Sequence, residues 1–189
     1  SPEALSAVLE QARAQGIKVV SHEATGIKNV DVDIEAFDNA SYGVDIMKSI
    51  GECTGGTGKY VQFVGGLTAK THMEWVEAAY DYQQKNFPNM ERVETPIEST
   101  DNETAAYEKA KEVLGKYPDI KAFQGSAGND VPGIARAIEE AGLSDQVCVM
   151  GTSIPSASAK YLATGSIDKI FFWDPALAGK AQLQIAKIL

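Results

Sequence analysis

The sequence predicts an α/β fold built on a doubly wound parallel sheet, and two observations carry that prediction. Apolar runs of strand length alternate with helical segments, which is the pattern of right-handed βαβ units. Five of these runs end in clusters of small and polar residues: VVSHEATG, VQFVGGLTAKTH, AFQGSAGND, VCVMGTSIPS and IFFWDP. Ligands bind outside the carboxyl ends of the strands in such sheets, so we expect the five clusters to line one cleft.

The first elements are a helix over residues 1–15 and a strand over residues 17–21. Pro2 suits the first helical turn, and apolar side chains recur at helical spacing up to Gly16. Residues 30–35 then alternate Val or Ile with acidic residues, which indicates a half-exposed strand. A complete wound domain normally starts with a strand, so we expect that an amino-terminal strand and helix are missing from this chain.

Asp38 is a good N-cap for the next helix, which ends near GECTGG. Thr71 and Glu74 form a capping-box pattern, so Thr71 also has a structural interpretation as an N-cap. The last helix lacks a glycine cap, and we expect the carboxyl end to be incomplete as well. The remaining predicted elements are strand 60–64, helix 71–86, strand 92–97, helix 101–116, strand 122–124, helix 131–141, strand 147–150, helix 156–163, strand 167–172 and helix 175–189.

Charge and hydropathy exclude several classes of partner. The formal net charge is −9, which argues against nucleic acid and against anionic membrane surfaces. No apolar run approaches the roughly 20 residues that a membrane-spanning helix needs, and no basic and apolar leader opens the chain. We expect a soluble segment with no nucleic-acid partner and no direct insertion into a membrane.

The two cysteines give little information about the compartment. Cys53 falls near a predicted helix end, and Cys148 falls inside an apolar strand, where it fits as a small core side chain. We therefore expect no disulfide. No CxxC or Cys/His spacing indicates a metal site, and we expect no metal and no cofactor.

Motifs for catalysis and for nucleotide binding are missing from the sequence. GxSxG, HExxH, GxGxxG and the P-loop pattern are all unmatched. A paired-carboxylate site made by Glu23 and Asp174 stays open, since the sequence does not give their separation. We expect a binding protein and not an enzyme.

The candidate ligand-binding residues follow the predicted strands. Glu23 offers acceptor oxygens that suit a pair of sugar hydroxyls, although a solvated loop acid is the alternative. His72 and Trp75 lie one turn apart at a helix opening and could provide a donor and an apolar wall; a surface histidine and a core tryptophan are the alternatives. Asp174 is also a good helix cap ahead of Pro175. The complete candidate set is Glu23, Thr71, His72, Trp75, Ser126, Ala127, Gly128, Ser153, Trp173 and Asp174.

Several stretches together resemble the type I periplasmic sugar-binding proteins of ABC importers, in the branch that binds rhamnose or autoinducer-2. They are GIKVVSHE, FDN, FVGGLTAKTHMEW, YQQKNFPNM, FQGSAG, GTSIPSASAKYLATGSI and WDPALAG, in the expected order across nearly the whole chain. The resemblance implies two wound lobes joined by three crossovers, with the ligand between them. Residues 1–25 would end the amino-terminal lobe, residues 30–172 would form the carboxyl-terminal lobe, and residues 174–189 would be a return helix on the first lobe.

The resemblance also suggests roles and a ligand. Glu23 stands at the position of a ligand-binding acid, and Trp173 and Asp174 fall at a hinge that lines the cleft. Thr71 and His72 replace an Asp-Gln pair of the autoinducer-2 proteins, and Ser126 and Gly128 replace their Pro and Ala. These differences argue against autoinducer-2 as the ligand. The pieces His72-x-x-Trp75 and Ile154-Pro155-Ser156 look closer to the rhamnose-binding proteins, so we favour a deoxyhexose such as rhamnose, or a related aldose or alditol.

The implied function is the substrate-binding component of an ABC transporter, which captures a monosaccharide and delivers it to a membrane permease. We expect a monomer that is exported, either to the periplasm or as an extracellular lipid-anchored protein. The alternatives are an autoinducer-2-binding protein, the ligand-sensing core of a LacI-type transcription regulator, and an enzyme.

Overall fold

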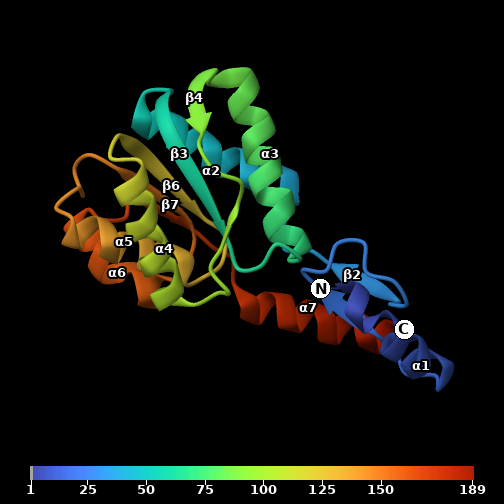
Figure 1. The fold of residues 1–189 in the computed structure, drawn as a ribbon. Coiled ribbons are helices and arrows are strands. Elements are labelled where there is room, and N and C mark those ends of the chain that lie inside the picture. The colour runs from blue at the N-terminus through green and yellow to red at the C-terminus, as the bar shows by residue number, and fades with distance from the viewer. Residues whose placement is uncertain (1) are drawn as a thin grey trace.

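The computed structural model describes residues 2–189, which form two parallel sheets surrounded by helices (Figure 1). The strands are β1 Val20–His22, β2 Val32–Ile34, β3 Thr57–Val64, β4 Asn89–Arg92, β5 Ile97–Glu98, β6 Ile120–Gly125, β7 Cys148–Thr152 and β8 Lys169–Phe171. The helices are the 3-10 turn Pro2–Leu5, α1 Ser6–Ala14, α2 Asn39–Thr54, α3 Lys70–Asn86, α4 Glu103–Lys116, α5 Asp130–Glu140, α6 Pro155–Thr164 and α7 Pro175–Ile188.

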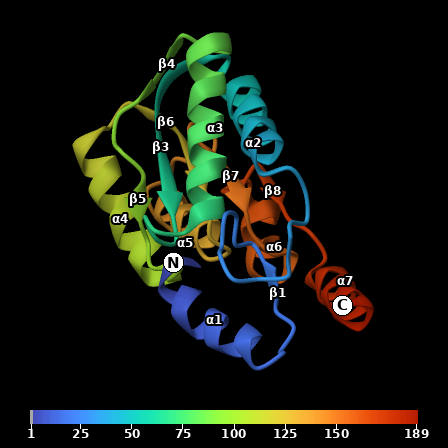
Figure 2. The ribbon, with the colours of Figure 1, turned by 90° about the vertical axis from the view of Figure 1, so that its right-hand side faces the viewer.

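The larger sheet has the strand order β4-β3-β6-β7-β8, and β5 also pairs with β3. Every pairing in both sheets is parallel, so the predicted α/β class with a parallel sheet is confirmed. Helices α2 and α3 cover one face of this sheet, and α4, α5 and α6 cover the other (Figures 1 and 2). Side chains of strand β3 lie in both cores: Val61 and Phe63 face α4 and α5, and Tyr60 faces α2 and α3.

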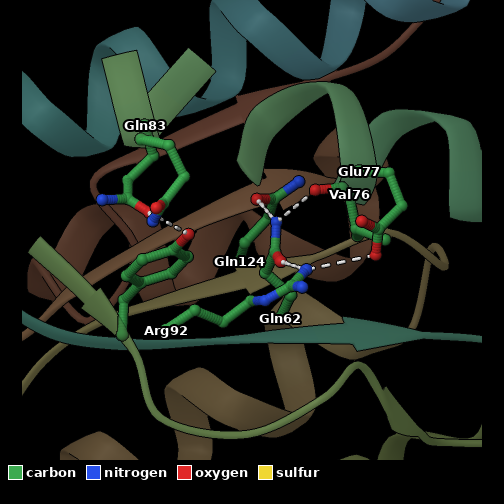
Figure 3. Close-up of polar contacts among 8 residues, drawn as sticks. Gln62, Val76, Glu77, Gln83, Arg92 and Gln124 are labelled. Carbon is green, nitrogen blue, oxygen red and sulfur yellow. Dashed lines mark hydrogen bonds and ion pairs between the residues drawn. The ribbon is translucent and has the colours of Figure 1, made fainter. Parts of the chain in front are cut away.

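A buried polar network fixes α3 on the sheet (Figure 3). Gln62 of β3 lies beside Gln124 of β6, and its amide nitrogen donates to the Gln124 side-chain oxygen (2.8 Å) and to the Val76 carbonyl (2.9 Å). Arg92 donates to the Gln62 side-chain oxygen at 3.0 Å and pairs with Glu77 at 3.1 Å. Buried amides are costly unless they are hydrogen-bonded, so this network favours one position of α3 on the sheet.

The helix starts test two capping predictions. Asp38 caps α2 as expected, since its carboxylate accepts from the Ser41 backbone N–H at 2.7 Å. The prediction that Thr71 caps the next helix is wrong: Ala69 holds the N-cap position, and Thr71 lies buried in the first turn. The predicted strand 92–97 is also two strands, because β4 ends at Arg92 and the chain pairs with β3 again only at Ile97.

Cys53 and Cys148 form a disulfide with Cα atoms 6.4 Å apart, so the prediction of no disulfide is wrong. Helix α2 packs across β7, and this places Cys53 near the end of the helix against the first residue of the strand. A separation of 95 residues leaves no local signal of that contact in the sequence. Cys148 is nevertheless a buried core residue, as its apolar surroundings predicted.

The smaller sheet of β1 and β2 lies beside α7, to one side of the larger sheet, and both chain ends lie in this region (Figure 1). Neither α1 nor α7 has a buried residue. Within residues 2–189, no helix is both long enough and apolar enough to cross a membrane.

Candidate functional site

A cavity of about 260 Å³ opens where the carboxyl ends of the parallel strands meet, as the five polar clusters predicted. The clusters that follow β1, β3, β6, β7 and β8 all contribute to its wall. It is lined by Glu23, His72, Asp101, Ser126, Ala127, Gly128, Thr152, Ser153, Ile154, Phe172, Trp173 and Pro175.

Seven of the ten candidate residues line the cavity, and Thr71, Trp75 and Asp174 do not. Trp75 is only 1% exposed, and its indole N–H donates to the Asn39 side-chain oxygen at 2.7 Å, so it lies in the core behind the site. Asp174 caps α7 by accepting from the Ala176 backbone N–H at 2.8 Å, and it borders a separate hollow beside β2. Trp75 is therefore a core tryptophan and Asp174 is a helix cap, which are the structural alternatives that the sequence offered for them.

Glu23 follows β1 and lines the cavity. Its φ of 54° is unusual for a residue with a side chain, which is a common feature of binding sites. The Oε1 atom is buried and has no hydrogen-bond partner in the protein. Burial raises the pKa of Glu23, and nearby Glu35 adds to that rise while His22 opposes it. The group can accept strong hydrogen bonds from a ligand that enters the cavity.

His72 is held in one tautomer by the β3–α3 turn. Its Nδ1 accepts the Gly65 backbone N–H at 3.2 Å, so the ring proton of the neutral form lies on Nε2. Burial lowers the pKa of His72, and Asp101 only partly opposes that shift. The neutral ring is therefore a fixed hydrogen-bond donor, and it rests against Trp75 with a centroid distance of 5.1 Å.

The loop after β6 supplies small residues and one free hydroxyl group. Ser126 is completely buried, and its Oγ atom has no partner in the protein. A side chain at Gly128 would meet no atom within 4 Å, so this residue leaves one side of the cavity open. The Gly128 carbonyl accepts from the Ser153 hydroxyl at 2.9 Å, which joins this loop to the loop after β7.

Trp173 gives the cavity its aromatic wall. The half-buried indole packs edge-on against Phe37 at a centroid distance of 5.3 Å and lies 6.4 Å from His22. It lines both the main cavity and the hollow beside β2. An amphipathic indole in this position can stack on the apolar face of a ring-shaped ligand.

Five lining residues were not among the candidates, and Asp101 is the most polar of them. It lies before α4 with φ of 50°, and its carboxylate accepts from the Asn129 backbone N–H at 3.3 Å. The sequence suggested only a helix start there. Thr152 is hydrogen-bonded to the Tyr42 hydroxyl at 3.0 Å, and its place at a strand end was the signal that could have found it. The other three are Ile154, Phe172 and Pro175.

Comparisons with known proteins identify the fold and the family. The family described as "Periplasmic binding protein domain" matches residues 1–189, whereas no curated protein matches the sequence. A solute-binding protein from Clostridium phytofermentas with bound L-rhamnose superposes with a TM-score of 0.89 at 23% identity, over 97% of this chain and 60% of that chain. A glucose-galactose binding protein from Geobacillus stearothermophilus gives a TM-score of 0.79 at 23% identity, over 88% of this chain and 59% of that one.

A third similar structure is an ABC transporter solute-binding protein from Burkholderia graminis in complex with D-arabinose. Its TM-score is 0.79 at 20% identity, over 88% of this chain and 58% of that chain. The chain thus spans less than two thirds of the length of these similar structures. Its fold is the α/β periplasmic binding protein fold, and the match along the whole sequence shows that the chain belongs to the periplasmic binding protein family.

Proposed function

We propose that this chain is part of a sugar-binding, substrate-binding component of an ABC transporter and that its ligand is a neutral monosaccharide. The observation that carries the proposal is the cavity with two buried oxygens that lack partners, Glu23 Oε1 and Ser126 Oγ, beside the neutral donor His72 and the indole of Trp173. Its volume of about 260 Å³ is slightly below the roughly 300 Å³ at which sites for drug-sized ligands begin, which suits a smaller ligand.

The charges around the cavity favour a neutral ligand over an anion. Two carboxylates, Glu23 and Asp101, line it, and none of its described lining residues is Lys or Arg. Anion sites normally present a guanidinium, an ammonium or free backbone amides. Sugar hydroxyls both donate to carboxylates and accept from His72, so a neutral polyol matches the wall.

For the ligand itself we propose a deoxyhexose such as L-rhamnose or a related aldose or alditol. The similar structure that contains L-rhamnose has a TM-score of 0.89, which supports testing this sugar first. Autoinducer-2 binding and a role as the sensing core of a transcription regulator are the competing outcomes. The family consists of binding proteins, and we propose no catalytic step.

We further propose that the protein is exported, acts as a monomer and delivers its ligand to a membrane permease. The Cys53–Cys148 disulfide supports export, since disulfides persist in oxidising compartments. We also propose that residues 1–25 and 174–189 belong to one lobe and residues 30–172 to the other, with the cavity between them.

Native mass spectrometry of the freshly purified full-length protein tests the ligand class, because a retained sugar adds its own mass. Calorimetry with L-rhamnose, D-arabinose and autoinducer-2 then tests the site. We expect Glu23→Gln to weaken sugar binding by roughly tenfold or more, since a hydrogen bond to a charged group contributes about 1.5 to 3 kcal/mol.

Glu91→Gln is the matched control, because it makes the same change at an exposed position on β4. Sugar affinity that is unchanged in Glu23→Gln would remove this residue from the site. A full-length protein that binds autoinducer-2 and no sugar would refute the proposed ligand.

A further inference from the structure

Asp130 is a buried carboxyl group directly behind the loop that follows β6. It is the first residue of α5 and is 0% exposed. Its Oδ2 atom accepts two backbone N–H groups of the cavity wall, from Ser126 at 3.0 Å and from Ala127 at 2.8 Å. Its other oxygen, Oδ1, has no hydrogen-bond partner in the protein. Asp130 does not line the cavity, so it can influence a ligand only through this loop.

The contacts of Asp130 decide what the loop presents to the cavity. The amides of Ser126 and Ala127 are both directed at the carboxylate and are not free to bind a ligand. The strand end before the loop packs closely against Asp130, because a Cβ atom added at Gly125 would lie 2.8 Å from the Asp130 Cβ. Ser126 and Gly128 both line the cavity; the buried Ser126 hydroxyl has no partner in the protein, and a side chain at Gly128 would meet no atom within 4 Å.

The electrostatic surroundings of Asp130 determine when it is protonated, and protonation changes how strongly it holds the loop. Within residues 2–189 no Lys or Arg pairs with it, and the facing charged group is Asp101, from the loop before α4, which also acts on His72 of α3. Burial raises the pKa of Asp130 to about 6, and nearby Asp101 adds to that rise, although the Ser99 side chain and the two amide hydrogen bonds oppose it. A protonated carboxyl is a weaker acceptor than a carboxylate, so acid should loosen its hold on the loop.

We propose that Asp130 is a positioning residue for ligand binding, which holds the Ser126–Gly128 loop in the conformation that offers the Ser126 hydroxyl and the open face of Gly128 to the ligand. The expected effect of Asp130 on affinity rests on the proposed function. Its effect on the loop can be measured without any ligand.

The first experiment is NMR on the ligand-free protein. We expect the amide chemical shifts of Ser126 and Ala127 to change with a midpoint near pH 6, the value to which burial raises the pKa of Asp130. Above that pH, the two amide protons should exchange slowly with solvent. Asp130→Ala should speed their exchange at least tenfold. Asp130→Asn keeps an acceptor and should retain most of the protection while abolishing the titration. Asp145→Asn, an exposed acid before β7, is the matched control and should change neither property.

The second experiment is calorimetry of the full-length wild type and the same variants with L-rhamnose and D-arabinose at pH 5 and pH 8. We expect at least tenfold weaker binding in Asp130→Ala. Wild-type affinity should fall at pH 5, and this fall should be smaller in Asp130→Asn, where only the part caused by protonation of Glu23 remains. Circular dichroism checks that each variant is folded.

The outcomes separate the two proposals. Unchanged amide exchange in folded Asp130→Ala, or unchanged sugar affinity despite faster exchange, would overturn the positioning role. If the wild type binds neither sugar, the choice of ligand fails, whereas the exchange and titration of the two amides still decide whether Asp130 holds the loop.

Discussion

The Cys53–Cys148 disulfide should contribute much of the stability of this chain. It closes a loop across 95 residues between α2 and β7. In the chain-entropy description, a cross-link that closes about 100 residues stabilises the folded state by about 4.7 kcal/mol, and values of about 2 to 4 kcal/mol are typical of measurements. Since domains are stable by only about 5 to 15 kcal/mol, loss of the bond should be plainly measurable.

Urea unfolding with and without a phosphine reductant measures this contribution. With an m value of about 2 kcal/mol/M, a loss of about 2 to 4 kcal/mol lowers the unfolding midpoint by about 1 to 2 M. The double variant Cys53→Ala/Cys148→Ala should unfold near the midpoint of the reduced wild type. It also loses some packing at position 148, because Cys148 is buried.

The control is the effect of the reductant on the double variant, which should be absent because it has no bond to reduce. Two results would refute the reasoning. One is a wild-type midpoint that does not move although mass spectrometry shows full reduction. The other is that both cysteines react with a thiol reagent in protein purified without reductant, which would show that the disulfide does not form.

Three further predictions concern single residues. Ligand binding should change tryptophan fluorescence in Trp75→Phe but not in Trp173→Phe, because Trp75 is 1% exposed while Trp173 lines the cavity; a response that survives in Trp173→Phe would contradict this. Gly128→Val should weaken sugar binding at least tenfold by calorimetry and leave the melting temperature within about 1 °C, since its side chain enters open space. Gly43→Ala should lower stability in urea by about 1 to 3 kcal/mol, because its Cβ would overlap the Trp75 carbonyl where α2 packs on α3.

The regular part of the fold was predictable from the sequence because its signals are local. Buried parallel strands read as apolar runs, and this located β3, β6 and β7. The Asp38 cap was predicted for the same reason, since a capping side chain bonds to an amide only three residues away. The cap predicted at Thr71 is wrong because α3 begins one residue earlier, at Lys70, and Thr71 lies buried in the first turn.

The site was predictable where it depends on topology and not where it depends on the direction of a side chain. Glu23 and Ser126 were predicted to lie near each other because strand ends converge in a parallel sheet, and both line the cavity. Trp75 was included among the candidates because helical spacing places it one turn from His72, but spacing does not say which side chain faces the cavity. The disulfide joins residues 95 positions apart, and no neighbouring residues announce such a contact.

Most polar atoms of the network around Gln62 have partners in the chain, with the Gln124 Nε2 atom as an exception, whereas two polar atoms of residues that line the cavity have none. Gln62 and Arg92 have partners in the chain, and these contacts hold α3, and with it His72, against the sheet. At the cavity, Glu23 Oε1 and Ser126 Oγ have none, and a buried polar atom without a partner costs about 1 to 3 kcal/mol. A ligand with hydroxyl groups can offer partners to such atoms, whereas an apolar molecule of the same size would leave them without partners. Under the proposed function, the core holds these unsatisfied groups in place, and we expect them to favour a polar ligand.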